Sequence, residues 1–195
     1  MSRGTFSLDG QTFDVDNNIW VIGDDSECLV IDAPHNVADI LAVVAGRTVK
    51  AILCTHAHDD HVRVAPELSE RVGAPILLHP ADQPLWALTH PHRKWDADLS
   101  DGDEITVGGT ALRVLHTPGH APGAVCFHAP DLGRVFTGDT LFQGGPGATG
   151  RSYSDAATIE QSIRDRLFTL PDETITHTGH GDDTTIGAER NSAGR

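Results

Sequence analysis

Cysteine is scarce in this sequence of 195 residues, and its three copies are widely separated. Cys28, Cys54 and Cys126 each lie within an apolar run. An odd number of widely spaced cysteines is not the framework of a disulfide-stapled secreted domain. We therefore expect three reduced thiols that pack as small core residues, and a cytoplasmic location.

Positive charge is also scarce. Lysine occurs only at Lys50 and Lys94, and the formal net charge is -14. Because phosphate backbones and anionic lipids attract basic proteins, this balance argues against a nucleic-acid partner and against a membrane partner. The sequence also has no apolar run long enough to cross a bilayer, and its first residues do not contain the apolar segment of a signal peptide.

Strands precede helices in each half of the chain, and no linker rich in proline, serine or glycine divides residues 1–195, so we expect a single domain. In the first half, apolar patterning predicts strands at 12–15, 19–22, 28–31, 49–54 and 75–78 and helices at 37–44 and 66–72. In the second half it predicts strands at 104–107, 111–115, 124–127, 134–137 and 174–176 and a helix at 154–170. Each half must bury one sheet face and one helix stripe. The pattern therefore predicts an α+β fold, a four-layer αβ/βα sandwich with two mixed sheets packed face to face and flanked by helices.

Three histidines and two aspartates crowd into the stretch that follows the strand predicted at 49–54. Residues 55–61 have the sequence T-H-A-H-D-D-H. Histidine is the commonest metal ligand and carboxylate is the usual hard partner of a divalent ion, so this stretch can present ligands to one ion or to two neighbouring ions. The alternative is a solvated polar turn in a histidine-rich chain.

Three further strand ends carry ligand-type side chains in glycine-containing turns. They are T-P-G-H at 117–120, T-G-D-T at 137–140 and T-G-H-G at 178–181. A rigid sheet scaffold can bring side chains from distant parts of a sequence together in one cleft at its strand ends. A solvated-turn explanation would require four coincidences, so the sequence favours a metal centre.

As a set, these motifs resemble the metallo-β-lactamase superfamily over nearly the whole chain, and the segments at 138–142 and 178–181 look most like its glyoxalase II branch. The resemblance implies the following ligands: His56, His58 and His120 for one divalent ion, Asp60, His61 and His180 for a second, and Asp139 as a bridge. Zinc is the expected metal because the set is rich in histidine, and the carboxylates also tolerate iron or manganese. The best-known β-lactamase subclass has Cys where Asp139 stands, so penicillin-type substrates are not expected.

The activity implied by this resemblance is hydrolysis of S-acyl thioesters of a low-molecular-weight thiol. Two close divalent ions share a water and lower its pKa, and the bridging hydroxide attacks the acyl carbonyl. Asp60 and Asp139 are the expected catalytic carboxylates, and a thiolate leaving group needs no separate protein acid. The chain ends soon after residue 189, so it resembles the short form of the group, without the C-terminal helical substrate domain.

Two rival enzymes and one binding function remain open. In a mononuclear iron persulfide dioxygenase of the same superfamily, His56, His120 and Asp139 would hold Fe(II) as a facial triad. A lactone hydrolase is the second rival. A metal-binding module is the non-enzymatic alternative, and a closed ligand shell without an exchangeable water would favour it.

Three residues outside the ligand set are candidates for supporting roles. In the family, basic and tyrosyl residues of the loop after Asp139 hold the thiol carrier, which points to Arg151 and Tyr153 here. The alternative for Arg151 is a surface ion pair. Asp32 ends a strand as the ligands do, and it either caps the helix at 37–44 or fixes a metal-bound imidazole.

Overall fold

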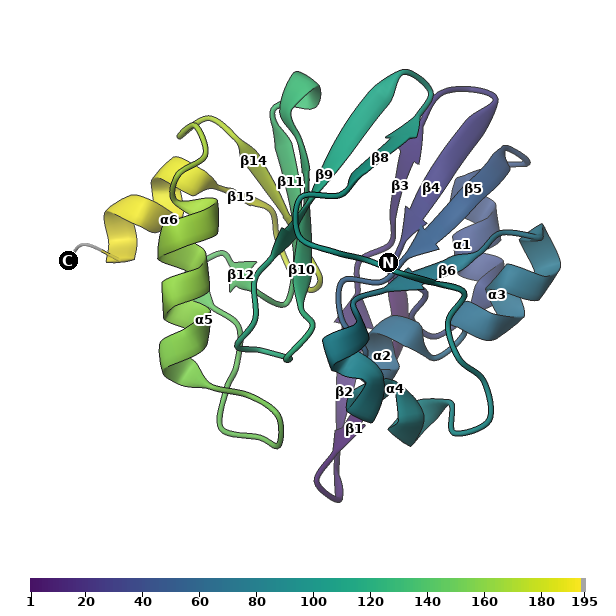
Figure 1. Ribbon diagram of the computed structural model, residues 1–195, viewed down its shortest axis with the longest axis horizontal. Coiled ribbons are helices and arrows are strands. Elements are labelled where there is room, and N and C mark those ends of the chain that lie inside the picture. Colours follow the sequence, from purple (N-terminus) through teal and green to yellow (C-terminus); the bar gives the residue numbers. More distant parts are fainter. Residues whose placement is uncertain (194–195) are drawn as a thin grey trace.

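The computed structural model describes residues 1–193, and its first sheet has five strands in the order β3-β4-β5-β6-β7. These strands are β3 (Trp20–Gly23), β4 (Glu27–Ile31), β5 (Thr48–Leu53), β6 (Ile76–Leu78) and β7 (Ala97–Asp98). Strands β4 to β7 run parallel, so the carboxyl ends of β4 and β5 lie side by side. The helices of this half are α1 (Val37–Val44), α2 (Asp59–Val62), α3 (Ala65–Val72) and α4 (Gln83–Thr89), and α1 and α3 cover the outer face of the sheet (Figure 1).

The second sheet has six strands in the order β15-β14-β11-β10-β9-β8. They are β8 (Glu104–Val107), β9 (Thr110–His116), β10 (Val125–Ala129), β11 (Arg134–Gly138), β14 (Ile175–Thr178) and β15 (Thr184–Thr185). A short hairpin of β12 (Leu141–Phe142) and β13 (Gly145–Pro146) follows β11. Helix α5 (Ala156–Ser162), its π-helical continuation Ile163–Leu167, and α6 (Ile186–Ala193) flank this sheet (Figure 1).

Strand side chains alternate between two apolar layers, which explains why the central strands are apolar on both faces. In β4, Leu29 and Ile31 face the second sheet, whereas Cys28 and Val30 face the helices α1 and α3. Phe127 of β10 belongs to the layer between the sheets, and its neighbour Cys126 packs against α5. The four-layer sandwich predicted from the sequence is confirmed.

The N-terminal hairpin is the main element that patterning did not predict in full. Strands β1 (Ser2–Leu8) and β2 (Gln11–Asn17) form a two-stranded sheet that extends away from the sandwich (Figure 1). Only 12–15 was predicted as strand, because residues 2–8 have no apolar run and are held mainly by pairing with β2. The Asp-Gly pair at Asp9 and Gly10, both with positive φ, forms the tight turn between the strands.

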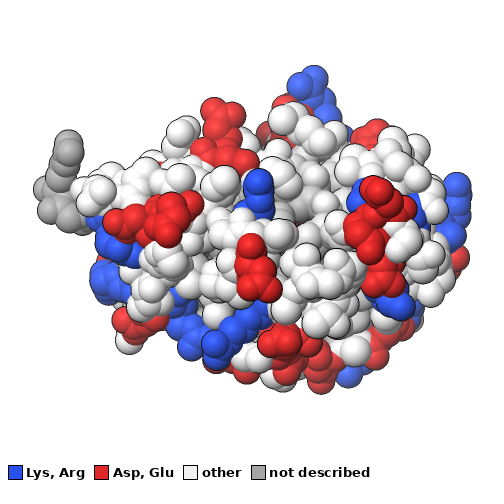
Figure 2. All heavy atoms as spheres, turned by 90° about the horizontal axis from the view of Figure 1, so that it is seen from above, with Lys and Arg blue, Asp and Glu red and all other residues white. Residues whose placement is uncertain are grey.

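Helix boundaries differ slightly from those expected. The helix predicted at 154–170 starts at Ala156, because the side chain of Asp155 accepts a hydrogen bond from the Thr158 N–H at 2.7 Å and so caps the helix. All three cysteines are free and buried, as predicted. None of the helices within residues 1–193 has the length and apolar character needed to cross a bilayer. On the face shown in Figure 2, acidic and basic side chains form several small groups separated by uncharged surface.

Candidate metal centre

All seven predicted ligands lie at one end of the two sheets, on loops that follow strands. His56 and His58 follow β5, Asp60 and His61 lie on the single turn of α2, and His120 lies between β9 and β10. Asp139 and His180 follow the neighbouring parallel strands β11 and β14. Parallel neighbours end at the same sheet edge, which brings these last two side chains together.

The first group of ligand atoms consists of three imidazole nitrogens. Nδ1 of His58 lies 3.0 Å from Nε2 of His56 and 3.0 Å from Nε2 of His120. The three side chains are buried, and their ligand atoms converge on one point.

The second group combines a carboxylate with two imidazoles. Nε2 of His180 lies 3.3 Å from Oδ2 of Asp60 and 3.3 Å from Nε2 of His61. Nε2 of His61 is 3.6 Å from the same Asp60 oxygen.

Asp139 lies between the two groups. Its Oδ2 is 3.5 Å from Nε2 of His120 and 3.4 Å from Nε2 of His180, and its Oδ1 is 3.3 Å from Nε2 of His61. That Oδ1 is buried and accepts no hydrogen bond from residues 1–193. An unsatisfied buried carboxylate oxygen is costly unless a cation is bound beside it.

The spacing of these atoms fits metal coordination. Nitrogen and oxygen ligands about 2.0–2.2 Å from a tetrahedral zinc ion lie roughly 3.3 Å from one another. The distances within both groups, 3.0–3.6 Å, bracket this value. Each group can therefore hold one divalent ion, with Asp139 in reach of both.

Hydrogen bonds of the other ring nitrogens determine which nitrogen each imidazole can offer to a metal. Nδ1 of His61 donates to Oδ2 of Asp32 at 2.8 Å, Nδ1 of His120 donates to the Ala148 carbonyl at 2.8 Å, and Nδ1 of His180 donates to the Asp16 carbonyl at 2.9 Å. With the proton on Nδ1, each Nε2 keeps the lone pair that a metal needs.

The two groups differ in electrostatics. Burial and the neighbouring His120 lower the pKa of His58 to about 3, and burial lowers the pKa of His56, so the first group is neutral. Burial alone would lower the pKa of His180, but Asp139 and Asp60 outweigh it and raise that pKa to about 10. The second group thus attracts positive charge, which protons or a divalent ion can supply.

A cleft of about 410 Å³ opens onto both groups. Its walls include Phe6 and Val15 of the N-terminal hairpin, Phe142 of β12, and Arg151. The guanidinium carbon of Arg151 lies 4.6 Å from the ring centre of Phe13, and Arg151 forms no ion pair with residues 1–193. Its charge nevertheless acts on the surface carboxylate of Asp9 in the N-terminal hairpin, so both roles considered for Arg151 stay open.

A sequence-family model for the metallo-beta-lactamase superfamily matches residues 13–180. The chain belongs to the metallo-beta-lactamase superfamily. Members of this superfamily bind divalent metal ions, and the cluster of His and Asp side chains described above supplies suitable ligands.

Three similar proteins extend this comparison. The chain is 32% identical to the probable metallo-hydrolase YqgX of Bacillus subtilis over 197 residues, a match that covers 89% of each chain. It is 35% identical to the hydroxyacylglutathione hydrolase of Aeromonas salmonicida over 167 residues, which covers 85% of this chain and 61% of that protein. Among solved structures, the di-iron-bound form of TTHA1623 superimposes with a TM-score of 0.80 at 33% identity and covers 98% of each chain.

In this metallo-beta-lactamase superfamily member, Asp32 and Asn17 hold ligand side chains in place through hydrogen bonds. Asp32 does not cap α1, because Asn36 does so through a bond from the Ala38 N–H. The Asp32 carboxylate instead accepts bonds from His61, from the Thr55 N–H at 2.7 Å and from the Thr55 hydroxyl at 2.8 Å. The hypothesis that Asp32 orients an imidazole therefore agrees with its contacts, and the N-cap hypothesis is wrong.

Asn17 supports the second group and was missed. Its amide donates to Oδ2 of Asp60 at 3.1 Å, and its carbonyl oxygen lies 2.7 Å from Nε2 of His35. Asn17 is buried at the end of β2, between the strands predicted at 12–15 and 19–22. The only feature of the sequence that could have identified Asn17 is that it is a polar residue at the end of a strand.

Tyr153 has no place at the cleft. Its side chain is 47% exposed, and it is not among the residues that line the cleft. Its φ of 71° belongs to a turn in which the Ser154 hydroxyl accepts a bond from the Gly150 N–H. Of the two predicted substrate-binding residues, the structure brings only Arg151 to the metal cluster.

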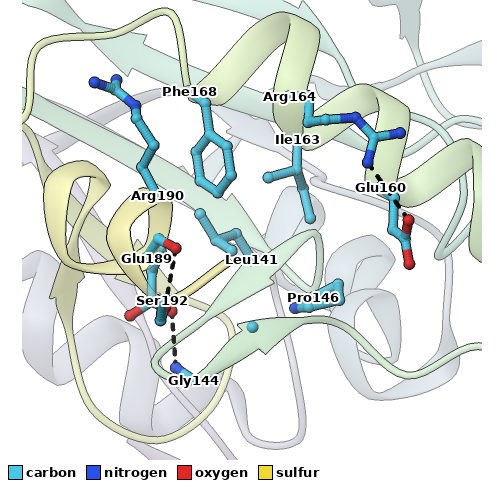
Figure 3. A pocket seen from close by; sticks show the side chains of 11 residues that line it. Leu141, Gly144, Pro146, Glu160, Ile163, Arg164, Phe168, Glu189, Arg190 and Ser192 are labelled. Carbon is cyan, nitrogen blue, oxygen red and sulfur yellow. Dashed lines mark hydrogen bonds and ion pairs between the residues drawn. The ribbon is translucent and has the colours of Figure 1, made fainter. Parts of the chain in front are cut away.

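A larger cavity, of about 510 Å³, lies between the β12–β13 hairpin and the helices α5 and α6, and none of the ligand groups found in residues 1–193 lines it (Figure 3). Leu141, Ile163 and Phe168 form its apolar floor. The charged side chains around it already have partners: Glu160 pairs with Arg164, and Glu189 accepts a bond from the Gly144 N–H at 2.9 Å. The metal cleft, although smaller, is the one lined by the metal-ligating side chains.

The remaining histidines contribute no atom to the ligand groups found in residues 1–193. The ring of His177, for example, packs at a tilt against Trp20 with 4.3 Å between ring centres, and its Nδ1 lies 2.8 Å from Oδ2 of Asp183. His90 and His116 bond to backbone carbonyls. These contacts are structural and do not involve the metal cluster.

Proposed function

We propose that this protein is a dinuclear metal-dependent hydrolase that cleaves S-acyl thioesters of a low-molecular-weight thiol. The observation that carries the proposal is the position of Asp139, whose two oxygens lie between two complete ligand groups. The similarity to a hydroxyacylglutathione hydrolase supports a thioester substrate. Zinc is the proposed metal because five of the seven ligands are histidines, and the di-iron-bound neighbour makes iron the alternative.

His56, His58 and His120 would hold one ion, and Asp60, His61 and His180 would hold the other. Bound there, the ions would supply Lewis acidity for the acyl carbonyl and ionisation of a water molecule near neutral pH. Asp139 fixes the separation of the two groups, and Asn17 holds the Asp60 carboxylate through its amide. Asp32 keeps the proton of His61 on Nδ1, away from the metal side.

The cleft walls suggest how the substrate is held. Phe6 and Phe142 present apolar surface beside the ligands, which excludes water from the acyl group. Arg151 stacks on Phe13 and keeps its guanidinium fork free for a carboxylate of the thiol carrier. A thiolate leaving group is a weak base, so the residues at the site need not protonate it.

Metal reconstitution tests this function. The protein is freed of metal with a chelator, reloaded with Zn²⁺, Fe²⁺ or Mn²⁺, and assayed with S-acyl glutathione, an S-acyl derivative of a second thiol, a lactone and a low-molecular-weight persulfide. We expect thioester hydrolysis that depends on added metal. Oxygen consumption with the persulfide and no hydrolysis would identify a dioxygenase instead, and metal binding without turnover of any substrate would identify a binding module.

A further inference from the structure

Asp82 is a fully buried carboxylate outside the ligand set. Its relative exposure is 0%, and burial raises its pKa to about 6. It stands at the N-terminus of α4, where an aspartate ordinarily caps the helix through its own side chain. Here it makes no such bond. The carboxylate therefore serves another part of the fold.

Both oxygens of Asp82 bond to loops that carry metal ligands. Oδ2 accepts a bond of 2.8 Å from the N–H of Ala57, the residue between His56 and His58. Oδ1 accepts a bond of 2.5 Å from the N–H of Gly123, in the loop that carries His120. The two loops are 60 or more residues apart in sequence, and one side chain joins them.

The packing around Gly123 shows that this contact is built into the fold. A Cβ atom at Gly123 would lie 2.8 Å from the backbone nitrogen of Asp82 and 2.9 Å from its carboxyl group. No larger residue fits there without a shift. The same two loops also meet through the bond from the Val125 N–H to the Thr55 carbonyl at 2.8 Å.

We infer that Asp82 is a positioning residue for the first metal group, which holds the loop of His56 and His58 at a fixed distance from the loop of His120. This inference rests on the proposed metal function. The Ala57 N–H fixes the orientation of the backbone between two ligands, so a change in that bond moves both imidazoles. Residues that orient metal ligands in this way typically alter metal affinity about 10–100-fold when substituted.

The test compares zinc affinity in two backgrounds. In Asp60→Ala the first group is complete and the second is not, and in His58→Ala the reverse holds. Asp82→Asn is made in each background, and the dissociation constant is measured by competition with a chromophoric chelator on metal-free protein. Asparagine keeps the shape of the side chain but places an NH₂ group against one of the two N–H donors. We expect zinc binding to weaken about 10–100-fold in the Asp60→Ala background and by less than about twofold in the His58→Ala background.

Asp96→Asn is the matched control. Asp96 also accepts a bond from a backbone N–H, that of Ile76 at 2.8 Å, in the same half of the fold and without contact to a ligand loop. It should leave zinc affinity unchanged in both backgrounds. Equal weakening by Asp82→Asn in the two backgrounds, or a lower melting temperature with unchanged affinity, would overturn the inference and leave Asp82 a structural residue. Because the readout is zinc affinity, a protein that binds zinc normally but hydrolyses no thioester would count against the proposed substrate only.

Discussion

Asp32→Asn is the substitution that best distinguishes a role in orienting a metal ligand from a role in stabilising the fold. The carboxylate accepts three bonds, from the Thr55 N–H, the Thr55 hydroxyl and Nδ1 of His61. Asp32 has a φ of 62°, a left-handed conformation that asparagine adopts more readily than alanine. Asparagine therefore preserves the backbone and changes only the hydrogen-bonding pattern.

The expected size of the effect follows from the tautomer of His61. The new amide can accept the Thr55 N–H through its oxygen, but its NH₂ then faces Nδ1 of His61. That ring would move its proton to Nε2, which lies 3.3 Å from Oδ1 of Asp139 on the metal side. Loss of such an orienting carboxylate typically weakens metal binding about 10–100-fold, equivalent to about 1.4–2.7 kcal/mol.

The assay is zinc competition in the His58→Ala background, where only the second group is complete. Asp24→Asn is the control, since Asp24 also accepts backbone N–H bonds, from Ser26 and Glu27, in a turn outside the cluster. We expect a loss only with Asp32→Asn. A dissociation constant within about twofold of the background would refute the tautomer argument, because it would mean that His61 binds metal equally well without its carboxylate partner.

Three further outcomes follow from the same geometry. Asp139→Ala should lower kcat for thioester hydrolysis roughly tenfold further than His180→Ala does, a difference of about 1.4 kcal/mol, because Asp139 reaches both ligand groups. Steady-state kinetics measures this difference. Near wild-type turnover in Asp139→Ala would place that residue outside the metal centre. Arg151→Ala should raise KM for carrier thioesters roughly tenfold or more, as expected for the loss of one charge-assisted hydrogen bond, and should leave KM for a small carrier-free thioester unchanged. Equal losses of activity on both substrates would place Arg151 in the chemistry or the fold. In metal-free protein the pKa of His180 is raised to about 10, so the stabilising contribution of this side chain is complete below pH about 6.5 and is lost as the pH rises through about 10. The free energy of unfolding, measured with urea, should decline over this pH range. The decline should be smaller in His180→Ala.

The layered fold was predictable because its strands and helices are strongly patterned. β4 and β5 are apolar on both faces, which only a strand buried between two layers requires, and the three- and four-residue spacing of apolar residues in α1 matches its packed face. The hairpin strand β1 was not predictable from periodicity, since its side chains are largely exposed or half-buried and pairing with β2 holds it in place.

The ligand cluster was predictable because each ligand follows a strand in a short motif, and the structure places all seven side chains together. Their supporting residues were harder to find. Asn17 reaches Asp60 across 43 residues of sequence, and Asp82 reaches Gly123 across 41. Such contacts depend on how loops from different strands meet, which a local sequence pattern does not encode.

The loop after Asp139 was also predictable only in part. Arg151 and Tyr153 are two positions apart and carried equal weight in the sequence, yet only Arg151 lines the cleft. Tyr153 has a positive φ, which turns the chain at that residue, and the Asp9 carboxylate of the N-terminal hairpin accepts a bond from the Ser152 N–H at 2.9 Å. The contact with the hairpin fixes the loop, and the hairpin itself had been only partly predicted.

The central claim is that two divalent ions bind between these seven ligands, and metal analysis of protein purified without added metal tests it most directly. Elemental analysis should find close to two ions per chain in the wild type and close to one in Asp60→Ala, which removes a ligand of the second group only. One iron per chain, unchanged by Asp60→Ala, would contradict the dinuclear hydrolase and favour a mononuclear iron enzyme.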